Sequence, residues 1–262
     1  MGKITEALRK AADDRLQRIE KINKVKEKEI LIIPKVGNSK VDPRIVTYFD
    51  PKALITEQYK ILRTNVLSLN RGSSGGKVVM VTSAIHSEGK TITSLNLAMA
   101  IAQSTQKPKV LLIDADLRRG RLARYLGVNQ KVGLSNVLSG KVGLDEALFK
   151  IDIENVTFMA SGTVPENPAE LLDSARMKQL LSEVKTQFDH ILIDTSPIIS
   201  VTDAGIVGSQ ADGVIMVIQA GRTQRGIVKR ATELLEQTHA KLLGHVLTNI
   251  EYHLPEYIYR YL

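Results

Sequence analysis

The sequence predicts an α/β fold, a mostly parallel sheet with helices on both faces. Two observations support this class. Short, continuous apolar runs end at turn residues, and segments of helical length and pattern separate them. Strands buried on both faces have such runs, and parallel strands need long, usually helical, connections between them. With 262 residues, the chain has room for one domain of this kind and an additional arm.

The elements follow in order along the chain. A first helix is expected at about 53–70, and further helices at about 90–104, 169–187, 202–210 and 224–238. The apolar runs predict strands at 78–81, 110–113, 156–159, 191–193, 214–218 and 242–247. We therefore predict a basic helical arm and linker over 1–45, a nucleotide-binding domain over 46–250 and a tyrosine-rich tail over 251–262.

Composition excludes several classes of protein. The chain has no Cys, so disulfides, thiolate zinc sites and Cys-held iron–sulfur clusters are excluded. No apolar run reaches the ~18 residues of a membrane span, and the first residues lack the apolar region of a signal peptide. A cytoplasmic location is expected.

The positive charge is concentrated at the beginning of the chain. The net charge is +8, and residues 1–40 alone contain eleven Lys or Arg and six Asp or Glu. Because the two signs are mixed, nucleic acid is not the favoured partner. A narrow apolar stripe follows helical spacing at Ile4, Leu8, Ala12, Leu16 and Ile19. This pattern suits a helical arm that docks on a partner or on the body, and the alternative is a solvated helix.

A phosphate-binding loop is predicted after the first strand of the body. Residues 82–91 read TSAIHSEGKT and lead into a helical segment. Inward-pointing backbone N–H groups and a helix N-terminus attract anions. Ala84 replaces the first Gly of the usual motif, whereas Gly-Lys-Thr is intact. The residues expected to line the nucleotide are Ser87, Glu88, Gly89, Lys90, Thr91 and Ile92. The alternative is an ordinary strand–turn–helix.

Three acids favour the nucleotide interpretation. Asp114 and Asp116 follow one apolar strand, and Asp194 ends another. The carboxyl ends of parallel strands form the ligand-binding edge of an open sheet. Mg²⁺ prefers one or two carboxylates together with phosphate and water. A nucleoside triphosphate with Mg²⁺ is therefore the predicted ligand, ATP being the expected nucleotide.

These motifs resemble the bacterial tyrosine kinases of capsular and exopolysaccharide synthesis, the BY-kinases, in their free-standing cytoplasmic autokinase form. The resemblance runs from about residue 46 to the last residue. It rests on the Gly-Lys-Thr loop, the D-x-D-x-R strand end (Asp114, Asp116, Arg118), the D-x-x-P strand end (Asp194, Pro197), residues 165–172 (PENPAELL) and the terminal Tyr cluster. It implies a P-loop NTPase-like fold and ATP-dependent phosphorylation of tyrosine.

The resemblance also implies roles for single residues. Lys90, Asp114, Asp116 and Arg118 would be catalytic. Thr91, Asp114 and Asp194 would hold Mg²⁺, and Asn249 would contact adenine. Glu57, Lys60 and Arg63 would form the contact of a homo-oligomeric ring. The phosphate acceptors would be Tyr252, Tyr257, Tyr259 and Tyr261 of an adjacent subunit. The resemblance implies two other partners, a membrane-embedded chain-length or activator protein and a tyrosine phosphatase. It also implies that the chain acts at the inner face of the plasma membrane and regulates polysaccharide synthesis or export.

Three positions depart from the family pattern. Ser87 stands where Gly is usual, and a left-handed turn there would cost a non-glycine residue about 1 kcal/mol or more. Gly120 stands where Pro is usual. Lys60 replaces an Arg in the ring motif, which keeps the charge and loses the bidentate fork.

Two other functions remain open from the sequence. A partitioning or positioning ATPase, acting as a nucleotide-gated switch without kinase activity, would carry a Lys at the position of Ile85. A scaffold with an inactive nucleotide site would be consistent with Ser87. For the tail, the alternative to a phosphoacceptor segment is an end that packs on the body. Pro255 argues against a helix that continues from the last strand.

Overall fold

The computed structural model describes residues 30–31, 41–69, 76–151 and 155–250. Within these residues, eight strands form one sheet in the order β1-β4-β5-β3-β6-β2-β7-β8. All neighbouring strands are parallel except β4 and β5. The strands are β1 (Ile30–Leu31), β2 (Lys77–Ser83), β3 (Val110–Asp114), β4 (Phe149–Ile151), β5 (Val156–Met159), β6 (His190–Asp194), β7 (Gly213–Gln219) and β8 (Leu242–Thr248). The predicted fold class is confirmed.

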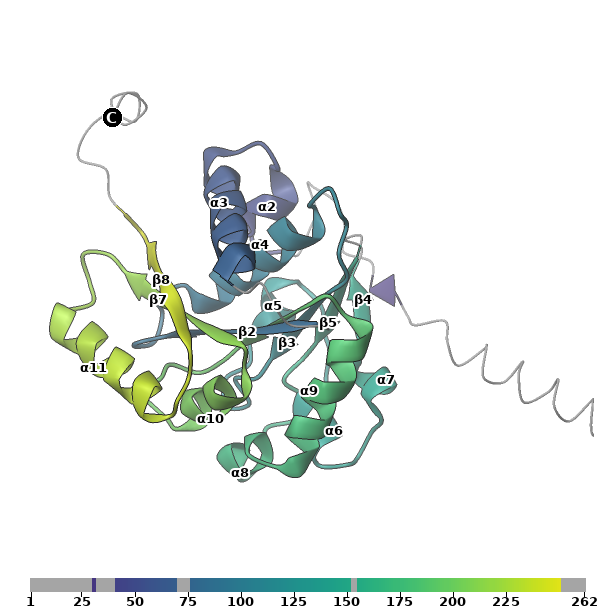
Figure 1. Ribbon diagram of the computed structural model, residues 1–262. Helices are drawn as coiled ribbons and strands as arrows, with labels where there is room; N and C mark the ends of the chain where they lie inside the picture. Colours follow the sequence, from purple (N-terminus) through teal and green to yellow (C-terminus); the bar gives the residue numbers. More distant parts are fainter. Residues whose placement is uncertain (1–29, 32–40, 70–75, 152–154, 251–262) are drawn as a thin grey trace, which may run out of the picture.

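Helices cover both faces of the sheet (Figure 1). One face carries α2 (Val46–Phe49), α3 (Leu54–Leu69), α4 (Lys90–Ala102) and α5 (Leu122–Tyr125), and the other carries α8 (Pro168–Leu172), α9 (Ala175–Gln187), α10 (Asp203–Gln210) and α11 (Arg225–Gln237). Two short helices, α6 (Leu134–Leu138) and α7 (Leu144–Ala147), lie in the connection that leads to β4. Two hydrophobic clusters, one on each face, form the core.

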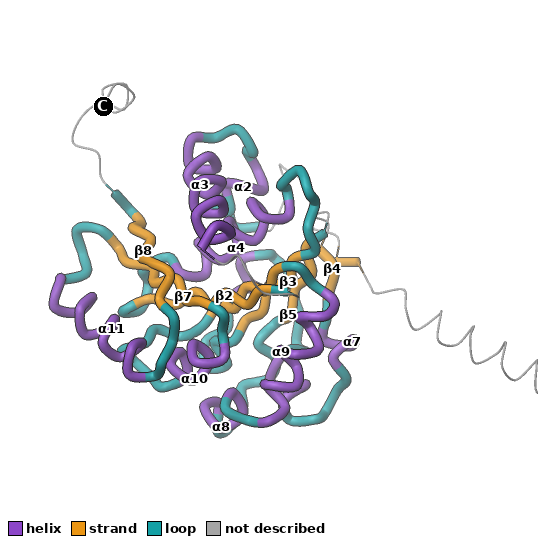
Figure 2. The backbone as a smooth tube through the Cα atoms, viewed as in Figure 1, coloured by secondary structure: helices purple, strands orange, loops and turns teal. Residues whose placement is uncertain are grey.

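The central strands are buried on both faces, as their continuous apolar runs predict. In β3 and β6 almost every side chain is buried. Strand β2 pairs with β6 on one side and with β7 on the other, and Figure 2 shows β2 beside β7. This arrangement places the carboxyl ends of β2, β3 and β6 side by side, because the three strands are parallel and in register. The edge predicted to bind the ligand is thus the edge where the loop and the acids meet.

Two predictions about the elements need correction. The single helix predicted over 169–187 is two helices, because α8 ends at Leu172, with Asp173 as its C-cap, and Ser174 caps the next helix by accepting a hydrogen bond from Met177 N at 3.3 Å. The short strands β1 and β4 and the helices α2, α5, α6 and α7 were not predicted, and β1 lies within the segment that was predicted as a helical arm and linker. Elements of two to five residues are too short to show a periodic pattern.

Part of the predicted linker belongs to the packed body. Val41 and Ile45 are buried in the cluster beneath α4, and Asp42 N donates to Tyr125 O at 2.9 Å. Thr47 then bonds with its hydroxyl to Asn96 Oδ1 on α4 at 2.8 Å. The body therefore includes residues 41–45, which precede the boundary predicted at 46.

The predicted apolar stripe of the arm and the four tail tyrosines lie outside the described residues. No helix in the described part of the chain combines the length and the apolar composition that a membrane span requires.

Candidate functional site: a phosphate loop beside buried carboxylates

The loop between β2 and α4 has the geometry of an anion cradle. Gly89 caps α4 with a φ of 95°, in the left-handed region that favours glycine. A Cβ at Gly89 would lie 3.4 Å from the Thr248 side chain. The first backbone N–H groups of α4 have no partner within the helix, so this end of the helix favours a negative ligand.

Ser87 has the strained backbone that its sequence context suggested. Its φ is 65°, although it is not glycine. Its side chain is exposed, and its carbonyl oxygen accepts a hydrogen bond from Arg222 Nη1 at 3.2 Å. A left-handed conformation costs such a residue on the order of 1–2 kcal/mol, and the surrounding contacts hold the turn in place.

Glu88 points into the protein rather than toward a ligand. The residue is 1% exposed, and its Oε2 accepts a hydrogen bond from Ile85 N at 2.7 Å. Its Oε1 accepts from Gln219 N at 3.2 Å and from the Thr223 hydroxyl. Its carbonyl oxygen accepts from Thr248 Oγ1 at 2.7 Å. Glu88 therefore ties the phosphate loop to the ends of β7 and β8.

The sequence had placed Glu88 among the residues lining the nucleotide. The structure assigns its side chain to this internal set of contacts, and the partners Gln219, Thr223 and Thr248 were not predicted. No local pattern marks them, because they lie 131–160 residues away in the chain.

Lys90 lies between two carboxylates at the beginning of α4. Its Nζ is 3.3 Å from Asp116 Oδ2 and 3.4 Å from Asp194 Oδ2. Burial alone would lower the pKa of Lys90, but the nearby carboxylates outweigh burial and raise it. Lys90 is therefore a charged ammonium at neutral pH.

Asp194 is held by two hydroxyls of α4. Thr91 Oγ1 donates to Asp194 Oδ2 at 2.7 Å, and Ser94 Oγ donates to Asp194 Oδ1 at 3.0 Å. Ser94 was not predicted as a site residue. Its spacing of three from Thr91, which puts both hydroxyls on one helical face, was the available signal.

Asp114 is fully buried at the end of β3, directly beside Asp194 in the register of the sheet. It accepts hydrogen bonds from Leu122 N at 3.0 Å and from Asp116 N at 3.2 Å. Burial and the Asp194 charge raise the pKa of Asp114 to about 7. Burial also raises the pKa of Asp194. The structure thus brings Lys90, Thr91 and the three acids together.

The oxygen donors fit a magnesium ion. Thr91 contributes a hydroxyl and Asp194 a carboxylate, both hard ligands, and Asp116 lies on the other side of Lys90. Among the described residues, no three acidic or imidazole side chains form a complete metal cage. A site of this composition suits Mg²⁺, which keeps water and phosphate in its coordination shell.

Arg118 is paired with an acid outside the carboxylate cluster. Its Nε and Nη2 donate to the two carboxylate oxygens of Asp203, at 2.8 and 3.1 Å. Asp203 is fully buried at the beginning of α10. The guanidinium that the resemblance implied to be catalytic is therefore paired within the chain, where it joins the loop after β3 to α10.

Asn249 and the residues of the predicted ring motif lie on two other elements. Asn249 follows β8 in a left-handed conformation, with a φ of 51°, beside the end of β7. On α3, Lys60 Nζ lies 2.6 Å from Glu57 Oε1, and Arg63 Nη1 donates to Ala100 O at 2.9 Å. Glu57 and Lys60 form an exposed pair, whereas Arg63 joins α3 to α4.

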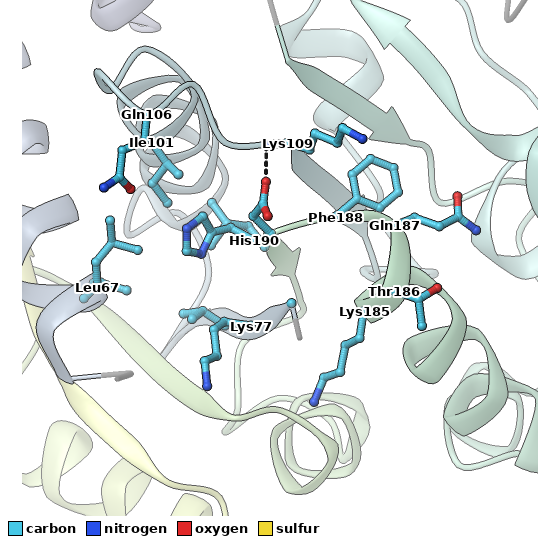
Figure 3. A pocket seen from close by; sticks show the side chains of 15 residues that line it. Leu67, Lys77, Ile101, Gln106, Lys109, Lys185, Thr186, Gln187, Phe188 and His190 are labelled. Carbon is cyan, nitrogen blue, oxygen red and sulfur yellow. Dashed lines mark hydrogen bonds between the residues drawn. The ribbon is translucent and has the colours of Figure 1, made fainter. Parts of the chain in front are cut away.

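A cavity of about 800 Å³ lies near the amino ends of the central strands, away from their carboxyl ends (Figure 3). Its lining includes Lys77 and His190 at the beginnings of β2 and β6, and Lys109 just before β3. In Figure 3 the side chain of Lys109 points away from those of Lys77 and Lys185, so the three ammonium groups do not converge on one place. Since Asp114 and Asp194 lie at the other ends of these strands, the cavity is separate from the carboxylate site.

The fold and the site define a P-loop nucleoside-triphosphate-binding domain. Residues 76–243 match the AAA domain family. The tyrosine-protein kinase YwqD of Bacillus subtilis is 38% identical over 219 residues, which are 83% of this chain and 90% of the relative. CpsD of Streptococcus agalactiae, also a tyrosine-protein kinase, is 37% identical over 74% of this chain and 84% of its own. The chain therefore belongs to the family of bacterial tyrosine-protein kinases, as the sequence motifs predicted.

Solved structures agree with this assignment. The kinase domain of Escherichia coli tyrosine kinase ETK is 31% identical, with a TM-score of 0.74 over 84% of this chain and 86% of that domain. Cobyrinic acid a,c-diamide synthase from Mycobacterium smegmatis, solved with an ATP analog and magnesium, is 25% identical, with a TM-score of 0.59 over 68% of this chain and 77% of its own. The likeness extends from tyrosine kinases to other P-loop proteins.

Proposed function

We propose that this chain is an ATP- and Mg²⁺-dependent tyrosine kinase that phosphorylates the tail of a second copy of itself. The carrying observation is the cluster of Lys90 and three buried or nearly buried carboxylates at the end of a phosphate loop. The names of its relatives support tyrosine as the acceptor. The proposed acceptors are Tyr252, Tyr257, Tyr259 and Tyr261.

In the proposed reaction, the tyrosine oxygen bonds to the γ-phosphorus of ATP, the bond from that phosphorus to the bridging oxygen breaks, and ADP leaves with the electron pair. The phenol proton passes to water. Lys90 exchanges its carboxylate contacts for phosphate oxygens and neutralises their charge. Thr91 and Asp194 hold Mg²⁺, which supplies charge neutralisation across the phosphates. A carboxylate is a poor base for a phenol of pKa about 10, so Asp114 and Asp116 act mainly by orienting the tyrosine hydroxyl.

Further parts of the proposal concern the surroundings of the kinase. Asn249 contacts adenine at the end of β8, and the exposed Glu57–Lys60 pair contributes to a homo-oligomeric ring. The chain acts at the inner face of the plasma membrane with a membrane-embedded activator, and a tyrosine phosphatase reverses its product. Polysaccharide synthesis or export is the process regulated.

Mass spectrometry of the full chain tests the central proposal. The parent is expected to carry phosphate on the tail tyrosines, and Lys90→Met is expected to carry none, because the ammonium that neutralises phosphate is lost. Lys109→Met, which removes an exposed cation at the other end of β3, serves as the control and should behave like the parent.

A mixing experiment then tests transfer between chains. The Lys90→Met chain supplies the acceptor tail, and a chain with its four tail tyrosines changed to Phe supplies the kinase. Phosphate on the Lys90→Met chain would demonstrate transfer in trans. ATP hydrolysis by the parent with an unmodified tail would instead indicate the nucleotide-gated switch, and the absence of both activities would indicate a scaffold.

A further inference from the structure

Two arginines that follow Asp116 in the chain have no side-chain partner among the residues that the structure describes. Arg119 and Arg121 lie in the loop between β3 and α5, and both are exposed. Within the described residues, neither side chain forms an ion pair or a hydrogen bond. Their neighbour Arg118 differs, since its fork is paired with Asp203. We call Arg119 and Arg121 the arginine rim.

The backbone of the rim is fastened directly to the carboxylates. Arg119 N donates to Asp116 Oδ1 at 3.1 Å. Between the two arginines, Gly120 packs closely on the site, because a Cβ there would lie 2.1 Å from Ser161 Oγ and 2.9 Å from Asp114 Oδ2. The rim therefore starts next to both acids that are proposed to orient the tyrosine hydroxyl, while its charged ends remain in solvent.

An acidic substrate would need positive charge near the site to offset its repulsion by the carboxylates. The site contains the carboxylates of Asp114, Asp116 and Asp194 and one ammonium, Lys90. This excess of acids repels a negatively charged peptide that approaches the site. Exposed guanidinium groups close to such a site attract negative charge and can donate two parallel hydrogen bonds to a carboxylate.

The tail has acids at a regular place relative to its tyrosines. Glu251 directly precedes Tyr252, and Glu256 directly precedes Tyr257. The other two tyrosines follow an apolar or a basic residue, in the pairs Ile258–Tyr259 and Arg260–Tyr261. The four tyrosines therefore fall into two classes that an arginine rim can distinguish.

We propose that the arginine rim binds the glutamate that precedes an acceptor tyrosine in the tail of a second copy. The rim thereby selects Tyr252 and Tyr257 over Tyr259 and Tyr261. This inference rests on the proposed function, because it deepens the choice of substrate at the same site. Exposed ion pairs are individually weak, so the selection amounts to about three- to tenfold in rate.

The test uses the mixing experiment, with phosphate quantified separately at each tyrosine of the Lys90→Met substrate chain. The kinase chain carries Phe at its own four tail positions, with or without Arg119→Glu and Arg121→Glu. The rim variant is expected to phosphorylate Tyr252 and Tyr257 about three- to tenfold more slowly, and the other two tyrosines at nearly the same rate. The difference should shrink as ionic strength rises, because salt screens exposed charges.

An exchange of charges between the tail and the arginine rim forms the second part of the test. A substrate tail with Glu251→Arg and Glu256→Arg should lose rate with the parental rim and recover it with the rim variant. Lys109→Glu makes the same change of charge at the other end of β3, so it should leave all four rates unchanged.

Equal slowing at all four tyrosines, a loss of ATP affinity in the rim variant, or failure of the exchanged tail to recover would each overturn the rim proposal. If the kinase chain with the parental rim phosphorylates no tyrosine at all, the proposed function itself fails, and the rim proposal fails with it. That result is distinct from normal phosphorylation that ignores the rim.

Discussion

The change Glu88→Gln tests the internal contacts that hold the phosphate loop. Glutamine keeps the size and shape of the side chain but replaces one carboxylate oxygen with an NH₂ group, which only donates. In the parent, the two oxygens accept from Ile85 N, Gln219 N and the Thr223 hydroxyl. The hydroxyl can rotate and accept, whereas the two backbone N–H groups cannot. One of them must therefore lose its acceptor.

The expected cost follows from these contacts. A hydrogen bond to a charged group contributes about 1.5–3 kcal/mol, and a buried donor left without a partner costs about 1–3 kcal/mol. Because Glu88 is 1% exposed, water cannot replace the lost acceptor. We expect Glu88→Gln to lower the free energy of unfolding by about 2–4 kcal/mol.

Urea unfolding followed by circular dichroism measures this change, with the slope against urea checked for constancy. Glu57→Gln is the matched control, since Glu57 pairs with Lys60 on the surface and should cost under about 1 kcal/mol. A Glu88→Gln protein within about 0.5 kcal/mol of the parent would refute the idea that this carboxylate holds the loop.

Two further changes address the loop and the buried acids. Ser87→Gly should raise the free energy of unfolding by up to about 1 kcal/mol, because glycine relieves the left-handed backbone at the cost of some unfolded-state entropy. His239→Gly, at an exposed position with a φ of 58°, is the control for the same relief away from the site, and a destabilised Ser87→Gly protein in urea unfolding would contradict this prediction. With a chelator present to remove divalent metal, the contribution of Asp114 to the free energy of unfolding should be greatest below about pH 4. It should fall as pH rises toward 7, because the folded protein retains on Asp114 a proton that the unfolded chain releases. Urea unfolding at several pH values should show this fall as a decrease on the order of 2–4 kcal/mol between about pH 4 and pH 7. Asp114→Asn should make the free energy of unfolding less dependent on pH. An equally steep dependence in the variant would exclude Asp114 as its source.

The sequence by itself determined the class of fold and the edge at which the site lies. Apolar runs specify strands buried on both faces, and acids at their ends must meet once parallel strands align. Asp114 and Asp194 were therefore predicted at one Mg²⁺ site, although only the strand order of the structure makes them direct neighbours. The left-handed turn at Ser87 was suggested only by the family resemblance, which places Gly at that position.

Only the tertiary structure decided which polar groups pair with one another. The contacts of Glu88 with Gln219 and Thr223, and of Arg118 with Asp203, join residues 85–135 positions apart. They exist because the strand order places β7 beside β2 and the connection after β6 beside the end of β3. A local sequence pattern contains no information about such a partner, because the free energy of the contact depends on two elements that the sheet brings together.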